Sequence, residues 1–256
     1  TDAVLPRAEE APLVIALSRS GETSETIMAV ERMRARGGAA LTIGCYGASP
    51  LAAASDAVLE IPEGREESYA QTRSFAGMLV ATQALAALVA EDAALGAEIA
   101  RLPAMAEGLI ARSAPLARRV GQDESIRRIT YLGSGPLFGL ASEATVKMKE
   151  MALSVAEPYH FMEFRHGPMS LVDGEHLVVA LLSEAMREYE WGVLEDLRAR
   201  GARIVVVGNH LDGAAAAYGE TLDLDAPVSE RACPVLYLPF LQLLAYYRSI
   251  GRGLNP

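Results

Sequence analysis

An internal repeat constrains the fold of this chain more than any other feature of its sequence. Residues 30–37 (VERMRARG) match residues 194–201 (LEDLRARG), and an apolar run ending in glycine follows each copy. Both copies then continue into a second apolar run that closes on proline. Short apolar runs alternating with helical patterns indicate an α/β fold with largely parallel sheets. The repeat therefore predicts two related α/β units, which we place at residues 1–115 and 116–256.

The hydrophobic periodicity predicts the elements of each unit. In the first unit we expect strands at residues 13–17, 39–44 and 58–61, and helices at 23–37, 49–54 and 72–91, with helical segments continuing to about 120. In the second unit we expect strands at residues 128–132, 176–182, 203–207 and 220–224, and helices at 137–155, 188–200 and 234–250. We expect irregular structure in the intervening polar loop 63–71 and in residues 157–174, which contain proline and glycine.

The two copies of the repeat begin differently. The second copy opens with a strand, a Gly-Ser-Gly turn at residues 133–135 and a helix, whereas the first copy has no counterpart because residue 1 already lies beyond it. We therefore expect the natural protein to start before this sequence. The missing loop would be a place for ligand-binding hydroxyls.

Composition narrows the classes of partner. With 23 basic and 33 acidic residues the formal charge is −10, which argues against nucleic acid and anionic membranes. Cys45 and Cys233 stand in no redox or metal-type spacing and are expected to be reduced, buried thiols of a cytoplasmic protein. The four histidines form no metal-ligand spacing with cysteines or acids, so we expect no metal. We also expect no cofactor. No leader pattern and no apolar run of about 20 residues is present.

A candidate anion site follows the first strand. The apolar run Leu13–Leu17 breaks at Ser18-Arg19-Ser20-Gly21, and residues 22–26 open a helical pattern. A turn of this kind gathers backbone N–H groups at a helix N-terminus, which favours an anion, and its hydroxyls add further donors. An ordinary helix N-cap explains the same residues, so both interpretations stay open. The equivalent turn of the second copy, residues 183–186, has no glycine and carries an acid, so only the first is expected to take an anion.

Two features of the second unit are candidates for proton chemistry. Glu143, Lys147 and Glu150 are spaced so that they share one helix face; a solvated row of ion pairs is the alternative. His166 lies between an arginine and a Gly-Pro turn, a setting that suits a loop-borne proton donor or a structural hydrogen-bonding group.

Taken together, these residues resemble the sugar isomerase (SIS) family, and in particular the isomerase domains of glucosamine-6-phosphate synthases and related phosphosugar isomerases, deaminases and fructosamine deglycases. The resemblance covers nearly the whole chain. It is carried by Ser18-Arg19-Ser20-Gly21-Glu22-Thr23, by Ala141-Ser142-Glu143 with Lys147 and Lys149-Glu150, and by residues 163–168 (EFRHGP). It implies two flavodoxin-like, three-layer units with parallel sheets, related by pseudo-symmetry, and a homodimer.

The resemblance also implies roles for individual residues. The sugar phosphate would be held by Ser18, Arg19, Ser20, Gly21 and Thr23, and the sugar would be lined by Tyr69, Ala70, Gln71, Thr72 and Ser134. Glu150 would move a proton between C1 and C2 of an open-chain sugar, a task for a carboxylate with reach and a tuned pKa. Lys147 and Glu143 would orient Glu150 or position hydroxyls. His166 would open the sugar ring. In this family the matching histidine commonly reaches into the neighbouring subunit's site.

These roles predict an enzyme that acts on a hexose or aminosugar 6-phosphate as an isomerase, deaminase or deglycase. The alternative is a regulatory protein that binds the sugar phosphate without chemistry; the presence of both Glu150 and His166 favours the enzyme. The sequence departs from the synthases in three respects. Residues 1–256 contain no glutaminase domain, Arg19 stands where the synthases have an amide, and their Schiff-base lysine would lie beyond Pro256.

Overall fold

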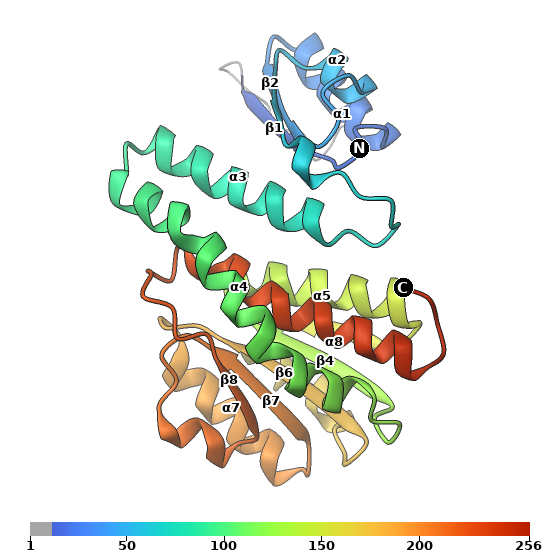
Figure 1. Ribbon diagram of the computed structural model, residues 1–256, viewed down its shortest axis with the longest axis vertical. Coiled ribbons are helices and arrows are strands. Elements are labelled where there is room, and N and C mark those ends of the chain that lie inside the picture. Colours follow the sequence, from blue (N-terminus) through green and yellow to red (C-terminus); the bar gives the residue numbers. More distant parts are fainter. Residues whose placement is uncertain (1–11) are drawn as a thin grey trace. The chain divides into compact units, whose positions relative to one another are not determined.

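The chain forms two compact units that divide between Glu91 and Asp92 (Figure 1). The computed structural model describes residues 12–256. The expected boundary at 115/116 falls inside one continuous helix, α4 (Ala93–Gly121). This helix belongs to the second unit, where it packs against α8 (Leu238–Gly251). The chain therefore divides before α4 rather than within it.

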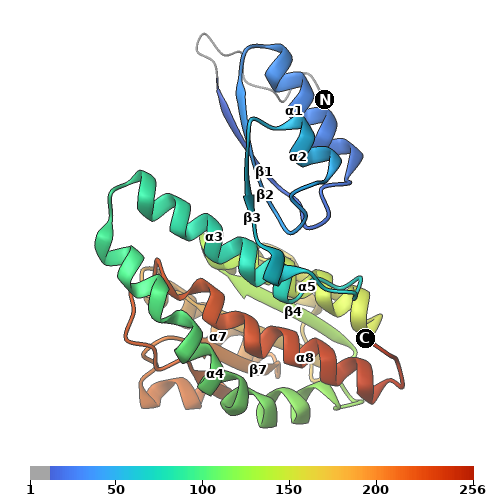
Figure 2. The ribbon, with the colours of Figure 1, turned by 45° about the horizontal axis from the view of Figure 1, so that its top comes forward.

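The first unit is a small parallel sheet with helices (Figure 2). Its strands run in the order β1-β2-β3, and its elements are β1 (Leu13–Leu17), α1 (Ser24–Ala35), β2 (Ala39–Gly44), α2 (Pro50–Ala54), β3 (Ala57–Glu60) and α3 (Arg73–Val89). Ala16, Val30, Ala40 and Leu51, one residue from each of β1, α1, β2 and α2, are buried together as a core. This core holds α1 and α2 against β1 and β2, and the candidate anion turn follows β1.

The second unit has a parallel sheet in the order β5-β4-β6-β7-β8. Besides α4 and α8 it contains β4 (Arg128–Gly133), α5 (Pro136–Ala152), β5 (Ala156–Tyr159), α6 (Phe161–Phe164), β6 (His176–Leu182), α7 (Arg187–Ala199), β7 (Arg203–Gly208) and β8 (Glu220–Asp223). Val178, Ala180 and Leu182 of β6 form a core with apolar residues of α7, and alternation along the strand turns the residues between them to the other face. Figure 1 shows α8 on the side of the sheet opposite α7.

The duplication is confirmed by the strand registers. Leu17 of β1 pairs with Ile43 of β2, and Leu181 of β6 pairs with Val207 of β7. In each unit the first of these strands is followed by one helix and the next parallel strand. The parallel α/β architecture with two related units is therefore as expected.

Several local expectations were wrong. Strand β5 lies in a segment expected to be irregular, and it carries Pro158. An edge strand tolerates proline, and in the sheet formed by the described residues β5 is an edge strand beside β4. The last helix begins at Leu238 rather than Pro234, after a 3-10 turn at Cys233–Tyr237.

The burial of both cysteines is confirmed, and both thiols are free. Burial raises the pKa of the Cys233 thiol to about 12. Within residues 12–256, no helix is long and apolar enough to cross a membrane.

Candidate functional site

The turn after β1 is held in a conformation that requires glycine. Gly21 has a φ of +66°, and a Cβ at this position would lie 2.1 Å from Oγ of Ser49. At the end of β2, a Cβ on Gly44 would lie 2.4 Å from the carbonyl oxygen of Ser18. The turn is thus packed directly against β2 and the start of α2, and its backbone direction is fixed by this packing.

The turn leaves several donors in place for an anion. Ser18 Oγ accepts a hydrogen bond from Gly21 N at 3.1 Å, and Ser20 Oγ accepts one from Glu22 N at 3.3 Å, so each hydroxyl still has its hydrogen to donate. Thr23 occupies the N-cap position of α1, but its side chain makes no capping hydrogen bond. An ordinary N-cap would fill that place. Within residues 12–256, no side-chain hydrogen bond caps the first N–H groups of α1, and such groups bind the anion in phosphate sites at helix N-termini.

A cavity of about 620 Å³ opens beside the turn, within the size range of small-molecule sites. Its lining residues are Leu17, Ser18, Arg19, Ser20, Thr23, Thr26, Gln71, Phe75, Met78, Leu79 and Thr82. Polar residues of the turn and α1 thus face an apolar wall from α3. Thr26 was not among the site residues expected from the sequence, although its position three residues after Thr23 puts both on one helix face.

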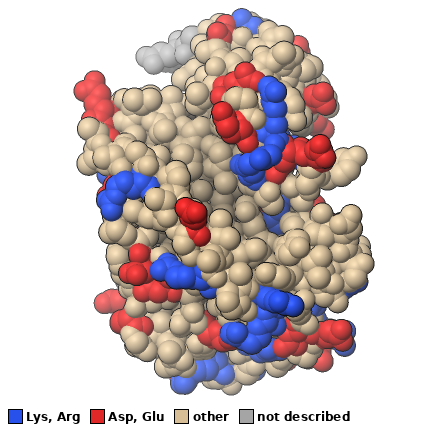
Figure 3. All heavy atoms as spheres, viewed as in Figure 1, with Lys and Arg blue, Asp and Glu red and all other residues tan. Residues whose placement is uncertain are grey.

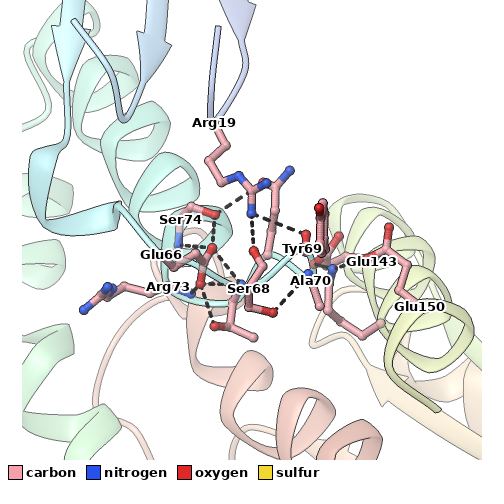
Figure 4. Close-up of polar contacts among 12 residues, drawn as sticks. Arg19, Glu66, Ser68, Tyr69, Ala70, Arg73, Ser74, Glu143 and Glu150 are labelled. Carbon is pink, nitrogen blue, oxygen red and sulfur yellow. Dashed lines mark hydrogen bonds and ion pairs between the residues drawn. The ribbon is translucent and has the colours of Figure 1, made fainter. Parts of the chain in front are cut away.

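The loop before α3 contributes Gln71 to this cavity. Glu66 anchors the loop by accepting hydrogen bonds from the backbone N–H groups of Thr72 and Ser74 at 3.1 and 3.2 Å (Figure 4). Burial opposes ionisation, but hydrogen bonds from the Ser74 and Thr72 hydroxyls outweigh it and hold the pKa of Glu66 below its usual range. Of the expected sugar-lining residues in the loop, only Gln71 lines the cavity. Tyr69 is 94% exposed and Ala70 is buried.

On α5, Lys147 lies between two carboxylates. Its Nζ is 3.5 Å from Glu143 Oε1 and 3.0 Å from Glu150 Oε2. The Lys147 side chain is 2% exposed, that of Glu143 12% and that of Glu150 49%. The expected shared helix face is confirmed, and the solvated row of ion pairs is not what forms. A buried ammonium instead holds one shielded carboxylate and one accessible carboxylate.

The corresponding turn of the second unit is filled by a carboxylate of the chain itself. Glu190 is fully buried and accepts hydrogen bonds from Ser183 N at 2.8 Å and Ser183 Oγ at 2.9 Å. Burial raises the pKa of Glu190, although hydrogen bonds from Ser134 and Ser183 oppose the shift. The Ser134 hydroxyl, expected to contact sugar, thus bonds to Glu190. In the repeat Glu190 occupies the position of Thr26, so the two units differ at the same place in the fold.

His166 lies on an exposed turn after α6. Its backbone N–H donates to Glu163 O at 2.9 Å, and Gly167 follows with a φ of +127°. An ion pair between Arg165 and Asp196 ties this turn to α7. Among the described residues, no hydrogen bond or ion pair joins the His166 side chain to the carboxylates or the lysine of α5.

The face of the molecule visible in Figure 3 carries charges of both signs. On the face drawn in Figure 3, lysine and arginine side chains alternate with acidic ones. An anionic ligand on this acidic chain would therefore depend on local donors such as those of the turn after β1.

Comparison with known proteins gives a consistent family. The SIS domain model matches residues 1–88 and 124–249. The chain is 31% identical to the glutamine–fructose-6-phosphate aminotransferase (isomerizing) of Treponema pallidum and 34% identical to that of Pyrobaculum aerophilum. The alignments cover 94% and 95% of this chain and 42% of each relative. The chain thus spans less than half the length of these curated relatives.

Solved structures share the fold over nearly the whole chain. The C-terminal domain of glucosamine-fructose-6-phosphate aminotransferase from Francisella tularensis has a TM-score of 0.87 at 23% identity, covering 97% of this chain and 75% of that one. Glucosamine-6-phosphate deaminase from Thermotoga maritima has a TM-score of 0.79 at 27% identity, covering 100% of this chain and 75% of that one. Tagatose-6-phosphate ketose/aldose isomerase from Escherichia coli has a TM-score of 0.83 at 25% identity, covering 96% and 70%. With the family model matching most of its residues, the chain belongs to the SIS domain family.

Proposed function

We propose that this chain binds a sugar phosphate through the turn after β1. The observation that carries the proposal is the uncapped start of α1 beside a cavity lined by Ser18, Ser20 and Thr23. The three hydroxyls and the first N–H groups of α1 would donate to the phosphate oxygens. Related proteins whose names include sugar phosphates support this choice of anion.

We further propose that the chain is an enzyme and that Glu150 is its proton-transfer group. Its carboxylate would take the proton from C2 of an open-chain aldose, so that the C–H electrons form the C1=C2 bond of an enediol while the carbonyl oxygen O1 takes a proton from water. The carboxylic acid would then return its proton to C1 as the O2 hydroxyl loses its proton to water, which gives the ketose. The half-exposed side chain of Glu150 supports reach to a substrate, and Lys147 fixes its position. Isomerisation, deamination and deglycation of a hexose or aminosugar 6-phosphate share this step and differ in the group that leaves.

Proton exchange in D₂O tests the enzyme. The full-length protein would be incubated with fructose 6-phosphate, glucosamine 6-phosphate or a fructosamine 6-phosphate, and deuterium entry at C1 or C2 followed by NMR. We expect the wild-type protein to catalyse deuterium exchange. Glu150→Gln should abolish the exchange but keep sugar-phosphate binding, and the control Glu195→Gln on α7 should leave both unchanged. Binding of all three sugars without proton exchange would refute the proposed catalysis and favour a non-catalytic regulator. Absence of binding would refute both.

We also propose a homodimer of a cytoplasmic protein, in which His166 acts as the ring-opening acid in the neighbouring subunit's site. The exposed turn that carries His166 supports this role. Mixing inactive Glu150→Gln and His166→Ala chains tests it, because each mixed dimer would contain one intact site. Random mixing is expected to restore roughly a quarter of wild-type activity. If the two inactive variants form mixed dimers but stay inactive, His166 does not act in the neighbouring subunit's site.

A further inference from the structure

Arg19 lies in the proposed phosphate turn, yet its side chain is directed to another loop. Its Nη1 donates to the carbonyl oxygens of Ser68 at 2.7 Å and Tyr69 at 3.3 Å (Figure 4). Its own carbonyl oxygen accepts from Cys45 N at 3.0 Å, which fixes its backbone at the end of β2. The guanidinium therefore links the turn after β1 to the loop before α3.

A second anchor holds the same loop from the other end. The Glu66 carboxylate accepts from the backbone N–H groups of Thr72, Arg73 and Ser74 and from the Thr72 hydroxyl at 2.9 Å. These groups form the start of α3, so the acidic side chain is favoured there by the helix dipole. Gln71 lies between the two anchors.

The position of Gln71 makes the anchors relevant to the cavity. Gln71 lines the cavity together with Ser18, Ser20 and Thr23. If the loop moved, the polar side chain on its cavity side would move with it, whereas the hydroxyls of the turn would keep their place. The phosphate and the rest of the ligand thus depend on different parts of the wall.

We propose that Arg19 is a positioning residue for the part of the cavity that receives the sugar, and that it is not a phosphate ligand. This inference rests on the proposed sugar-phosphate function. The phosphate already has donors in three hydroxyls and the start of α1, while the Arg19 bonds given above go to loop carbonyls. Arg19 and Glu66 together hold Gln71 in place for the sugar hydroxyls.

The test compares two ligands on one set of variants. Affinities for inorganic phosphate and for fructose 6-phosphate would be measured by NMR titration for wild type, Arg19→Met, Arg19→Lys and Glu66→Gln. We expect Arg19→Met and Glu66→Gln to weaken fructose 6-phosphate binding about tenfold, because the loop must then be ordered on binding. Inorganic phosphate affinity is expected to stay at the wild-type value. Arg19→Lys keeps the charge and a donor, and should recover part of the loss.

Arg34→Met is the matched control. The Arg34 guanidinium also donates to a backbone carbonyl of the first unit, Ala54 O at 2.8 Å, but Ala54 is the last residue of α2, and α2 does not line the cavity. We expect it to change neither affinity. Amide hydrogen exchange in β2 would establish that each variant is folded, and faster exchange confined to residues 68–71 in Arg19→Met would follow from the loosened loop.

Two results separate the possible failures. Equal weakening of inorganic phosphate and fructose 6-phosphate in Arg19→Met, with no loss in Glu66→Gln, would overturn the positioning role and make Arg19 a phosphate ligand. Wild-type protein that binds neither ligand would refute the proposed function itself.

Discussion

Replacing Gly21 by alanine tests whether the turn after β1 is built as described. Gly21 has a φ of +66°, and the added Cβ would lie 2.1 Å from Ser49 Oγ and 2.6 Å from Ser49 Cβ. Ser49 in turn caps α2, because its Oγ accepts from Ala52 N at 3.2 Å. The substitution therefore combines a left-handed backbone, a steric overlap and a disturbed cap.

The structure supplies a control that separates these costs. Gly37 has a φ of +85° with nothing within 4 Å of an added Cβ, so Gly37→Ala measures the backbone cost alone, about 1 kcal/mol. At Gly21 the overlap and the loss of the cap add about 2 kcal/mol. We expect Gly21→Ala to cost about 3 kcal/mol in total. Combining it with Ser49→Gly should return most of the excess, because both overlapping side-chain atoms are removed.

Urea-dependent hydrogen exchange of the β2 amides is the assay, since it reports on the first unit separately. Binding of fructose 6-phosphate would be measured in parallel and is expected to weaken in Gly21→Ala and to stay unchanged in Gly37→Ala. An equal loss of stability in the two variants, or no recovery in the double variant with Ser49→Gly, would refute the close packing of the turn.

Two further substitutions test the second unit. Lys147→Met should lower the free energy of unfolding by about 2–3 kcal/mol, because the shielded Glu143 carboxylate loses its ammonium partner, whereas the half-exposed Glu150 adds little. The urea midpoint measures this loss, and the double variant with Glu143→Leu should recover much of it. A single variant as stable as wild type would contradict the buried pair. For Asp123, hydrogen bonds from Arg203 and Ser125 outweigh burial and hold the pKa of the carboxyl far below the usual 3.8. The ionised carboxylate therefore stabilises the folded state fully above pH 3.8, and this stabilisation is lost as the pH falls below 3.8 toward the folded-state pKa. Asp123→Asn should therefore be less stable than wild type at neutral pH, and the difference should shrink steadily as the pH falls below 3.8; a difference that did not shrink with acid would be the contrary result.

The fold was largely predictable because the sequence contains an internal repeat of the same α/β pattern. The matching segments 30–37 and 194–201 lie in α1 and α7, and the apolar runs after them form β2 and β7 with equivalent registers. Strand β5 was missed because Ala156–Tyr159 contains proline and glutamate and lacks the apolar pattern of a central strand. The division of the chain was misplaced because sequence patterns do not show that α4 packs against α8.

The candidate site was predictable where local spacing decides it. Gly21 and the shared face of Glu143, Lys147 and Glu150 follow from turn chemistry and helical periodicity. The burial of Glu190 and its bonds to Ser134 and Ser183 depend on contacts between distant segments. Sequence spacing says nothing about such contacts.

The most direct test of the account concerns the difference between the two copies of the repeat. Fructose 6-phosphate would be titrated into ¹⁵N-labelled protein while the backbone amide resonances are followed. We predict saturable shifts at Gly21 and in the first turn of α1, and none at residues 183–190, where Glu190 already occupies the turn. Shifts at residues 183–190 with none at residues 18–26 would contradict the assignment of the phosphate site to the first unit.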